Sequence, residues 1–271
     1  MIPSHIYHYT SLETLFLILE FNTFRFNRLD RMNDPFDGFS QLYCNSRMNI
    51  FSSSWTSEKR DELPMWKIYS DLKGVRIRMP IDLFNFSDNL TVSKLNKGRN
   101  YLIKSVLNKP YLIERKELAN LQKNDTEYQF LTKSVYGPTK VDYVAKKSDL
   151  SKGLVKLDKK NVGFPIYEIN LNLIGQKKID YWNFEKEYRY RIFYGDAIVI
   201  AGSSPVLEDF HDNSPIITNY IDIEFKPESL EKIEIILGPE SNEDTKFRIE
   251  EILKNKNVKE FKILKSKIII N

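Results

Sequence analysis

The sequence predicts an α+β protein with a mixed or antiparallel sheet, and three observations point to this fold class. Residues 183–194 alternate, with mostly apolar or aromatic residues at even positions and polar residues at the odd positions from Asn183 to Arg191, which is typical of a strand with one packed face. Two other segments, residues 12–19 and 243–254, carry apolar residues at helical spacing. The 271 residues are 41% apolar and show no repeat or clear linker, so we expect one domain over residues 1–271 with a single large core.

The first third of the chain is expected to alternate strands with short helices. An opening strand at residues 5–10 places His8 and Thr10 on one face. Thr10 and Glu13 then match a capping box at the start of the first helix. Residues 28–38 contain the turn signals Asn-Asp-Pro and Asp-Gly and are expected to form a loop. The other elements expected here are strands at residues 24–26, 51–55 and 74–79 and a helix at residues 63–71.

The middle of the chain differs in composition from both ends. Residues from about 92 to 160 are rich in lysine and leucine, with helical spacing at residues 102–107 and 112–121, so we expect a helical insertion in the domain. Strand character returns at residues 164–171 and continues in the alternating segment. The elements expected after it are a loop at residues 202–215, strands at residues 232–237 and 261–270, and the amphipathic helix between those two strands.

Composition excludes several classes of protein. The 41 basic and 37 acidic residues leave a net charge of +4, which permits contact with a polyanion without requiring it. A single cysteine, Cys44, excludes an intramolecular disulfide framework and a multi-cysteine zinc site. No apolar run approaches the roughly 20 residues of a membrane span, and the first residues lack the basic and apolar regions of a secretion signal. We therefore expect a cytoplasmic protein without a membrane partner.

Two constellations in the first forty residues are candidates for ligand binding. His8, at the end of the first strand beside Tyr9 and Thr10, could donate to a ligand hydroxyl, or it could be a structural histidine bonded to the backbone. In the segment Asn33-Asp34-Pro35-Phe36-Asp37, proline restricts Asp34 to extended conformations. Asp34 and Asp37 could then face a common pocket, or Asp34 could simply form an Asx-turn.

Two further constellations lie on a helix and on a strand. Trp66 and Tyr69 are three residues apart on the predicted helix and share a face, where they could stack on a base or a nicotinamide, or pack in the core. Glu185, Glu187 and Arg189 would share one face of the alternating strand. Arg189 could keep a neighbouring glutamate ionised or hold a phosphate, although an exposed ladder of salt bridges would give the same pattern.

The order of these motifs carries a resemblance. The chain contains Tyr-His-Tyr-Thr, Phe-Arg-Phe, Asn-Asp-Pro-Phe-Asp, Met-Trp-x-x-Tyr and a late Lys-x-x-x-Trp-x-x-Glu-x-Glu-x-Arg. It resembles a widespread bacterial family marked by N-D-P-F-[ED] and W-x-x-E-x-E-x-R motifs. A histidine in the first strand, an aromatic residue in the middle and a glutamate in a late strand look like the ADP-ribosyltransferase superfamily, including DarT-like toxins and proteins of abortive-infection phage defence.

This resemblance implies a sheet core of the ADP-ribosyltransferase type and NAD as a substrate, with no metal. It implies that His8 binds the ribose and nicotinamide side of NAD, that Tyr69 stacks near the nicotinamide, and that Glu187 or Glu185 is catalytic. The acceptor of ADP-ribose would be a nucleic acid or a protein, and a partner from the same defence cassette is an open alternative. The remaining candidates for NAD binding are Tyr9, Thr10, Asn33, Asp34 and Trp66, with Arg25 or Arg189 for phosphate.

Two other functions fit the same residues. Asp34, Asp37, Glu185 and Glu187 could bind Mg²⁺ in a metal-dependent nuclease or phosphoesterase. The cleft could also belong to a non-catalytic nucleotide-binding module of a defence system, which would be stabilised by its ligand without turnover. The arrangement of His8, Tyr69 and Glu187 discriminates among these functions, because the NAD hypothesis requires them to converge on one cleft.

Overall fold

The computed structural model describes residues 2–39, 46–84, 130–158, 166–169, 173–195 and 219–270. These residues form a mostly antiparallel sheet with few helices, which confirms the α+β class. None of the described helices combines the length and apolar character that a membrane crossing requires. The helices are α1 (Leu12–Phe21), α2 (Leu63–Ser70) and α4 (Glu243–Asn255), with short 3-10 turns η1 (Leu29–Arg31), η2 (Ser46–Asn49), η3 (Lys147–Asp149), η5 (Asp180–Glu185) and η7 (Pro227–Leu230).

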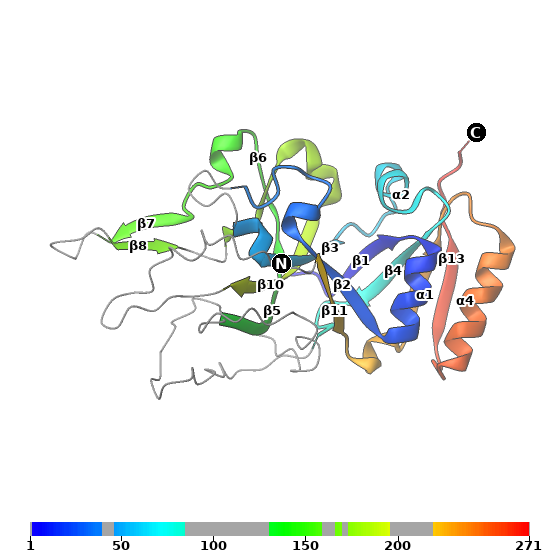
Figure 1. Ribbon diagram of the computed structural model, residues 1–271. Helices are drawn as coiled ribbons and strands as arrows, with labels where there is room; N and C mark the ends of the chain where they lie inside the picture. Colours follow the sequence, from blue (N-terminus) through cyan, green and yellow to red (C-terminus); the bar gives the residue numbers. More distant parts are fainter. Residues whose placement is uncertain are drawn as a thin grey trace, which may run out of the picture.

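The described strands build one nine-stranded sheet and two small two-stranded sheets (Figure 1). The main sheet has the order β11-β2-β3-β1-β4-β12-β13, and β10 joins it by pairing with both β3 and β5. Its strands are antiparallel except for the parallel pair β12 and β13. The strands of the main sheet are β1 (His5–Thr10), β2 (Thr23–Arg28), β3 (Ile50–Thr56), β4 (Val75–Pro80), β5 (Phe130–Lys140), β10 (Glu187–Gly195), β11 (Tyr220–Glu224), β12 (Ile233–Leu237) and β13 (Phe261–Lys265). The small sheets pair β6 (Asp142–Val144) with β9 (Lys177–Ile179) and β7 (Val155–Asp158) with β8 (Ile166–Ile169).

Strand β3 is the place where the sheet divides. On one side it pairs with β10 over seven positions, from Thr56 opposite Glu187 to Ile50 opposite Phe193. On the other side, β1 pairs with it only at Thr56, and β2 only at Ser52 and Phe51. The middle of β3 therefore borders a region where β1 and β2 separate.

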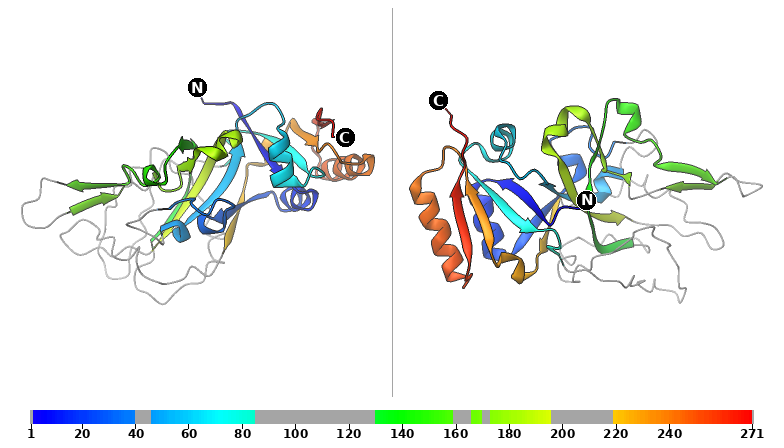
Figure 2. Two further views of the ribbon diagram at one scale, coloured as in Figure 1. Left: turned by 90° about the horizontal axis from the view of Figure 1, so that it is seen from above. Right: turned by 180° about the vertical axis from the view of Figure 1, so that it is seen from behind.

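The core is formed on the two faces of β1. Ile6 faces the main apolar cluster together with Leu15 and Leu19 of α1 and with Ile249 of α4. Tyr9 points to the opposite face, as alternation along a strand requires, and packs against Met65 and Trp66 of α2. Figure 2 shows α1 and α4 side by side at one end of the sheet and the β7–β8 hairpin projecting at the other end.

The first helix begins one residue later than the capping-box prediction requires. Ser11 is its N-cap, and the Ser11 side chain accepts a hydrogen bond of 3.1 Å from the backbone N–H of Thr14. Thr10 cannot serve as the cap because it is still the last residue of β1, paired with Val75 of β4. The predicted pairing of Thr10 with Glu13 is therefore wrong.

The predicted strand at residues 183–194 also begins later than expected. Its first residues belong to the 3-10 turn η5, and Lys186 adopts the left-handed conformation with φ of 44°. Extended structure starts only at Glu187, because a left-handed residue interrupts the strand ladder. Glu185 thus lies on the turn, and it does not share a strand face with Glu187 and Arg189.

The predicted helical insertion is only partly within the described residues. Its two segments with helical spacing, residues 102–107 and 112–121, lie outside them, as does the loop predicted at residues 202–215. Residues 130–158, which the prediction also included, form β5, β6, η3 and β7. Helical character is therefore wrong for this portion, in which β5 extends the main sheet by pairing with β10.

Candidate functional site

A pocket with a volume of about 230 Å³ lies beside the middle of β3. Residues of β1, β2 and β3 contribute to it, which places it where β1 and β2 separate. Helix α2, residues 31–33 and the segment from β9 to β10 supply the rest of its wall. The lining residues are Tyr7, His8, Tyr9, Arg25, Asn27, Arg31, Met32, Asn33, Ser52, Ser53, Ser54, Trp55, Thr56, Met65, Tyr69, Lys178, Glu185 and Glu187.

The structure brings many of the predicted site residues together in this pocket. His8 comes from β1, Tyr69 from α2 and Glu187 from β10. These three are the residues on which the NAD hypothesis depends, and they converge on one cleft. The predicted site residues that line the pocket are His8, Tyr9, Arg25, Asn33, Tyr69, Glu185 and Glu187.

His8 is held as a neutral hydrogen-bond acceptor. Its Nδ1 lies 3.0 Å from the carbonyl oxygen of Ser54, and since a carbonyl only accepts, Nδ1 carries the proton. The imidazole packs against Trp55 and Phe24, with ring centroids 5.0 and 5.7 Å away. Burial lowers the pKa of His8, so the neutral ring presents Nε2 as an acceptor. His8 thus makes the backbone bond expected of a structural histidine, and in this tautomer Nε2 has no proton to donate to a ligand hydroxyl.

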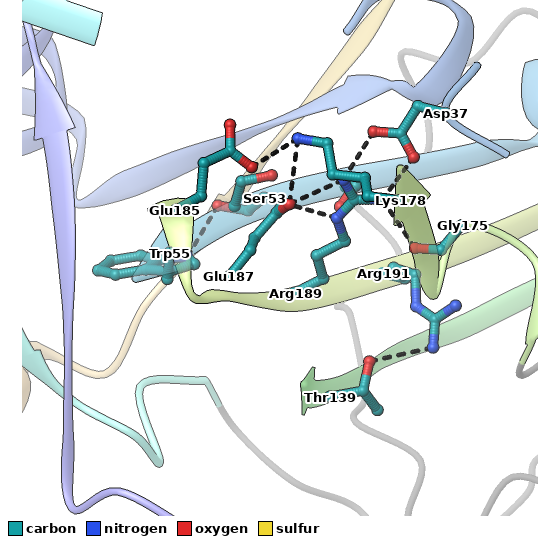
Figure 3. A network of polar contacts seen from close by, with 12 residues as sticks. Asp37, Ser53, Trp55, Thr139, Gly175, Lys178, Glu185, Glu187, Arg189 and Arg191 are labelled. Carbon is teal, nitrogen blue, oxygen red and sulfur yellow. Dashed lines mark hydrogen bonds and ion pairs between the residues drawn. The ribbon is translucent and has the colours of Figure 1, made fainter. Parts of the chain in front are cut away.

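Glu187 lines the pocket, and hydrogen bonds to both of its carboxylate oxygens hold it in place. Arg189 donates to both of its oxygens, at 2.6 and 2.9 Å, and also binds Asp37 through two hydrogen bonds of 2.5 and 2.6 Å (Figure 3). Arg189 is fully buried and additionally donates to the carbonyl of Gly175. Burial alone would raise the pKa of Glu187, but the charges of Arg189 and Lys178 outweigh it and lower that pKa to about 2.

Lys178 is a buried cation placed between two glutamates. Its Nζ lies 2.7 Å from Oε2 of Glu185 and 3.3 Å from Oε2 of Glu187, and Figure 3 shows it spanning them. The same ammonium lies 4.7 Å from the ring centroid of Trp182, a favourable cation–π distance. The lysine side chain is 1% exposed, so its charge depends on these neighbours.

Glu185 is the carboxyl of the pocket whose pKa lies close to neutral pH. Tyr69 donates its hydroxyl to Oε1 of Glu185, and Asn33 donates to the same hydroxyl at 2.8 Å. Burial, followed by the nearby charge of Glu187, raises the pKa of Glu185 to about 7, although Lys178 and Tyr69 oppose the change. Glu185 therefore exchanges its proton near neutral pH.

The charges of this network do not cancel when all its acids are ionised. Within the described residues, the connected group contains the carboxyls of Asp37, Glu187 and Glu185 and the two cations Lys178 and Arg189. Asp37 and Glu187 balance the two cations, which leaves one carboxylate in excess. Glu185 either holds a proton or offers a negative charge to a cation in the pocket.

Four predicted site residues lie outside the pocket lining. Thr10 is paired within the sheet, and Arg189 lies behind Glu187. Trp66 is fully buried in edge-to-face contact with Tyr9. Asp34 forms the Asx-turn, accepting a 2.9 Å bond from the backbone N–H of Phe36.

Sequence reasoning missed several lining residues. Lys178 stood in the late motif, but the adjacent pair Lys177-Lys178 is indistinguishable by composition from a solvated surface pair. Asn27 and Arg31 also line the pocket, but neither belongs to a sequence motif. The Arg31 side chain is 61% exposed. Asp37 was a candidate for the pocket, but it does not line it; instead, Asp37 forms a buried ion pair with Arg189.

The metal-dependent alternative is not favoured by this geometry. No group of three or more histidine, cysteine, aspartate or glutamate side chains in the described part of the chain is arranged to hold a metal ion. The carboxylates that a nuclease would need are occupied by protein groups, since Arg189 binds both Asp37 and Glu187. Glu185 is occupied by Lys178 in the same way.

Comparison with protein-family models, with curated proteins and with solved structures finds no match for this chain.

Proposed function

We propose that this protein is an NAD-dependent ADP-ribosyltransferase with a sheet core of that type, acting in the cytoplasm as a toxin or phage-defence effector. The acceptor in this proposal is a nucleic acid or a protein. The observation that carries it is the convergence of His8, Tyr69, Glu185 and Glu187 on one pocket that contains an excess carboxylate.

The reaction breaks the bond between the ribose anomeric carbon and the nicotinamide nitrogen. The bonding electrons leave with nicotinamide, which becomes neutral, and positive charge develops on the ribose. Glycoside cleavage likewise uses carboxylates beside an oxocarbenium-like centre. A fixed carboxylate accelerates such a step when it stabilises the developing cation more than the ground state.

The two glutamates have different roles in this proposal. Glu187 is held ionised by Arg189 and Lys178 and orients the site as a permanent anion. Glu185 supplies the charge that the network leaves uncompensated, and with a pKa of about 7 it accepts the proton that the acceptor releases as its new bond to the anomeric carbon forms.

The neutral imidazole of His8 suits recognition of the sugar. With Nδ1 bonded to Ser54, Nε2 accepts a hydrogen bond from a ribose hydroxyl. Tyr69 is fixed by hydrogen bonds to Glu185 and Asn33, which orients its ring for stacking. The volume of about 230 Å³ is below the usual range of roughly 300–1,000 Å³ for ligand pockets, so it suits the nicotinamide and ribose end, with the phosphates lying towards Arg25.

The test is release of nicotinamide from NAD, followed by chromatography, with DNA, RNA and protein offered as acceptors of labelled ADP-ribose. We expect wild type to release nicotinamide and Glu187→Gln and Glu185→Gln to be slowed by about 100-fold or more, comparable to removing a transition-state-stabilising group. Glu250→Gln, on the distant helix α4, is the matched control and should behave as wild type. Absence of NAD binding together with wild-type toxicity of Glu187→Gln in cells contradicts the proposal.

A further inference from the structure

Lys178 and Arg189 are the two cations of the buried charge network, and they differ in position. Arg189 lies behind Glu187 and reaches Asp37, whereas Lys178 lines the pocket itself and contacts both glutamates. Its bond to Glu185 uses Oε2, so the other oxygen, Oε1, is left for the Tyr69 hydroxyl. The lysine therefore holds one carboxylate oxygen of Glu185 while the other oxygen accepts the hydrogen bond from Tyr69.

We propose that Lys178 is the positioning residue of this site: its buried ammonium, in contact with both glutamates, directs Glu185 towards Tyr69 and stabilises the ionised form of that carboxyl. The inference deepens the proposed function and rests on it for the consequence in catalysis. Without the ammonium, Glu185 would keep the hydrogen bond from Tyr69 but would lose its cation, and Glu187 would keep only Arg189, which Asp37 already shares. Like charges at close range favour protonation of one member of the pair.

The groups that face Glu185 come from several elements. Tyr69 approaches from α2, Glu187 from β10, and Lys178 from β9. Tyr143 of β6 accepts a hydrogen bond of 2.9 Å from the backbone N–H of Glu187 and so helps to fix the strand start. Among these, Lys178 is the one cation that touches Glu185 directly, and its removal is therefore the informative change.

The experiment titrates Glu185 by NMR in the full chain labelled with δ-¹³C glutamate. The Glu185 signal is assigned as the one missing from Glu185→Gln. In Lys178→Gln, which keeps a hydrogen-bond donor but removes the charge, we expect the titration midpoint to rise by at least about one pH unit, a tenfold change in the protonation equilibrium. Lys178→Arg restores a cation and should keep the midpoint within about half a unit of wild type. Lys177→Gln is the matched control, because that lysine bonds only backbone carbonyls in the described structure, and it should leave the midpoint unchanged.

The activity readout separates this inference from the proposed function. If wild type releases nicotinamide, the acid limb of its pH profile should move upward in Lys178→Gln by the same amount as the NMR midpoint. A structural role for Lys178 would instead lower activity equally at every pH and leave the midpoint in place, which overturns the inference. If wild type consumes no NAD and the midpoint still moves, the proposed function fails while the role of Lys178 stands.

A second measurement needs no lysine variant and applies if Lys178→Gln does not fold. The ¹⁵Nζ resonance of Lys178 in wild type should titrate with the same midpoint as Glu185, and this transition should vanish in Glu185→Gln. A Lys178 resonance that does not respond to Glu185 overturns the inference.

Discussion

Arg189 and Arg25 each bind an aspartate with two hydrogen bonds, and the two pairs differ in burial. Arg189 and its partner Asp37 are completely buried, whereas the side chains of Arg25 and Asp222 are 45% and 37% exposed. Arg189→Met leaves Asp37 and Glu187 buried without their main partner, and breaking a buried pair costs about 3–5 kcal/mol. Arg25→Met should cost less than about 1 kcal/mol, because solvent screens an exposed pair. Urea denaturation measures both, and equal losses would contradict the assignment of Arg189 as the central cation.

Glu185 should make stability fall as pH rises through neutrality. Burial raises its folded pKa from 4.5 to about 7, so the folded state binds more protons than the unfolded state between these values. That contribution is fully present below pH 4.5 and is lost as pH approaches 7. The difference in free energy of unfolding between wild type and Glu185→Gln should change by up to about 3 kcal/mol between pH 5 and 8, as measured by urea denaturation at both values. A difference that does not depend on pH contradicts the role of Glu185 as the titrating group.

Glu187 gives the opposite dependence in a separate range. Arg189 and Lys178 overcome its burial and lower its pKa from 4.5 to about 2, so the unfolded state binds more protons in that interval. Its contribution is present above pH 4.5 and is lost as pH falls towards 2. Comparing wild type with Glu187→Gln by urea denaturation at pH 6 and pH 3 should show the wild-type advantage shrinking at the lower pH. An advantage that grows on acidification would mean that the two glutamates have exchanged roles.

At the scale of elements, Gly74 fixes how α2 and β4 meet the end of β1. A Cβ at this position would lie 2.2 Å from the carbonyl oxygen of Thr10 and 2.7 Å from Cβ of Ser70, so Gly74→Ala must push backbone apart. We expect a loss of about 3 kcal/mol in unfolding free energy, at the upper end of ordinary overpacking. Under the proposed function, weaker NAD binding should accompany it, because β1 carries His8 and α2 carries Tyr69. Gly153→Ala is the control: its nearest atom would be 3.5 Å away, so only its positive φ penalises it, by about 1–2 kcal/mol. Equal effects of the two substitutions would show that close packing at Gly74 is unimportant.

Local sequence patterns predicted elements well where local forces decide them. The predicted strand at residues 51–55 is β3, the helix at residues 63–71 is α2, and the amphipathic helix at residues 243–254 is α4. The predicted start of this strand was wrong at Lys186, a polar residue that interrupts the alternation between Glu185 and Glu187 and where the backbone turns through a left-handed conformation. The sequence pattern also failed in β5, whose pairing with β10 depends on contacts distant in the sequence.

The candidate site shows the same limit for individual side chains. His8 and Glu187 were singled out because they lie in recognisable patterns, and Lys178 stands in the late motif, but local composition does not show that Lys178 is buried and Lys177 is not. In the structure, β9 pairs with β6, and adjacent residues of a strand point to opposite faces. Lys178 is thereby buried against two glutamates, while Lys177 reaches the carbonyls of Asp149 and Lys152. The tertiary fold alone decides which lysine joins the site.

At the scale of the whole molecule, the pocket joins parts of the chain that are far apart in sequence. Its walls come from β1, β2, residues 31–33, β3, α2 and the segment from Lys178 to Glu187, so a ligand that fills it links these elements and binds the folded state only. If NAD is that ligand, as the proposed function requires, then at 100 times its dissociation constant it should add about 2.7 kcal/mol to the free energy of unfolding, or roughly 5–10 °C in Tm for a chain of this size. Differential scanning fluorimetry of wild type and Glu185→Gln measures this shift.

Stabilisation combined with turnover distinguishes the three functions that the sequence allowed. An ADP-ribosyltransferase predicts that NAD stabilises both proteins and that wild type alone releases nicotinamide at an appreciable rate. A non-catalytic nucleotide-binding module predicts the same stabilisation with no nicotinamide from either protein. A metal-dependent nuclease predicts stabilisation by Mg²⁺ and nucleic-acid cleavage that a chelator abolishes. Because Arg189 and Lys178 occupy the carboxylates, we expect Mg²⁺ to leave Tm unchanged and nicotinamide release to persist in EDTA.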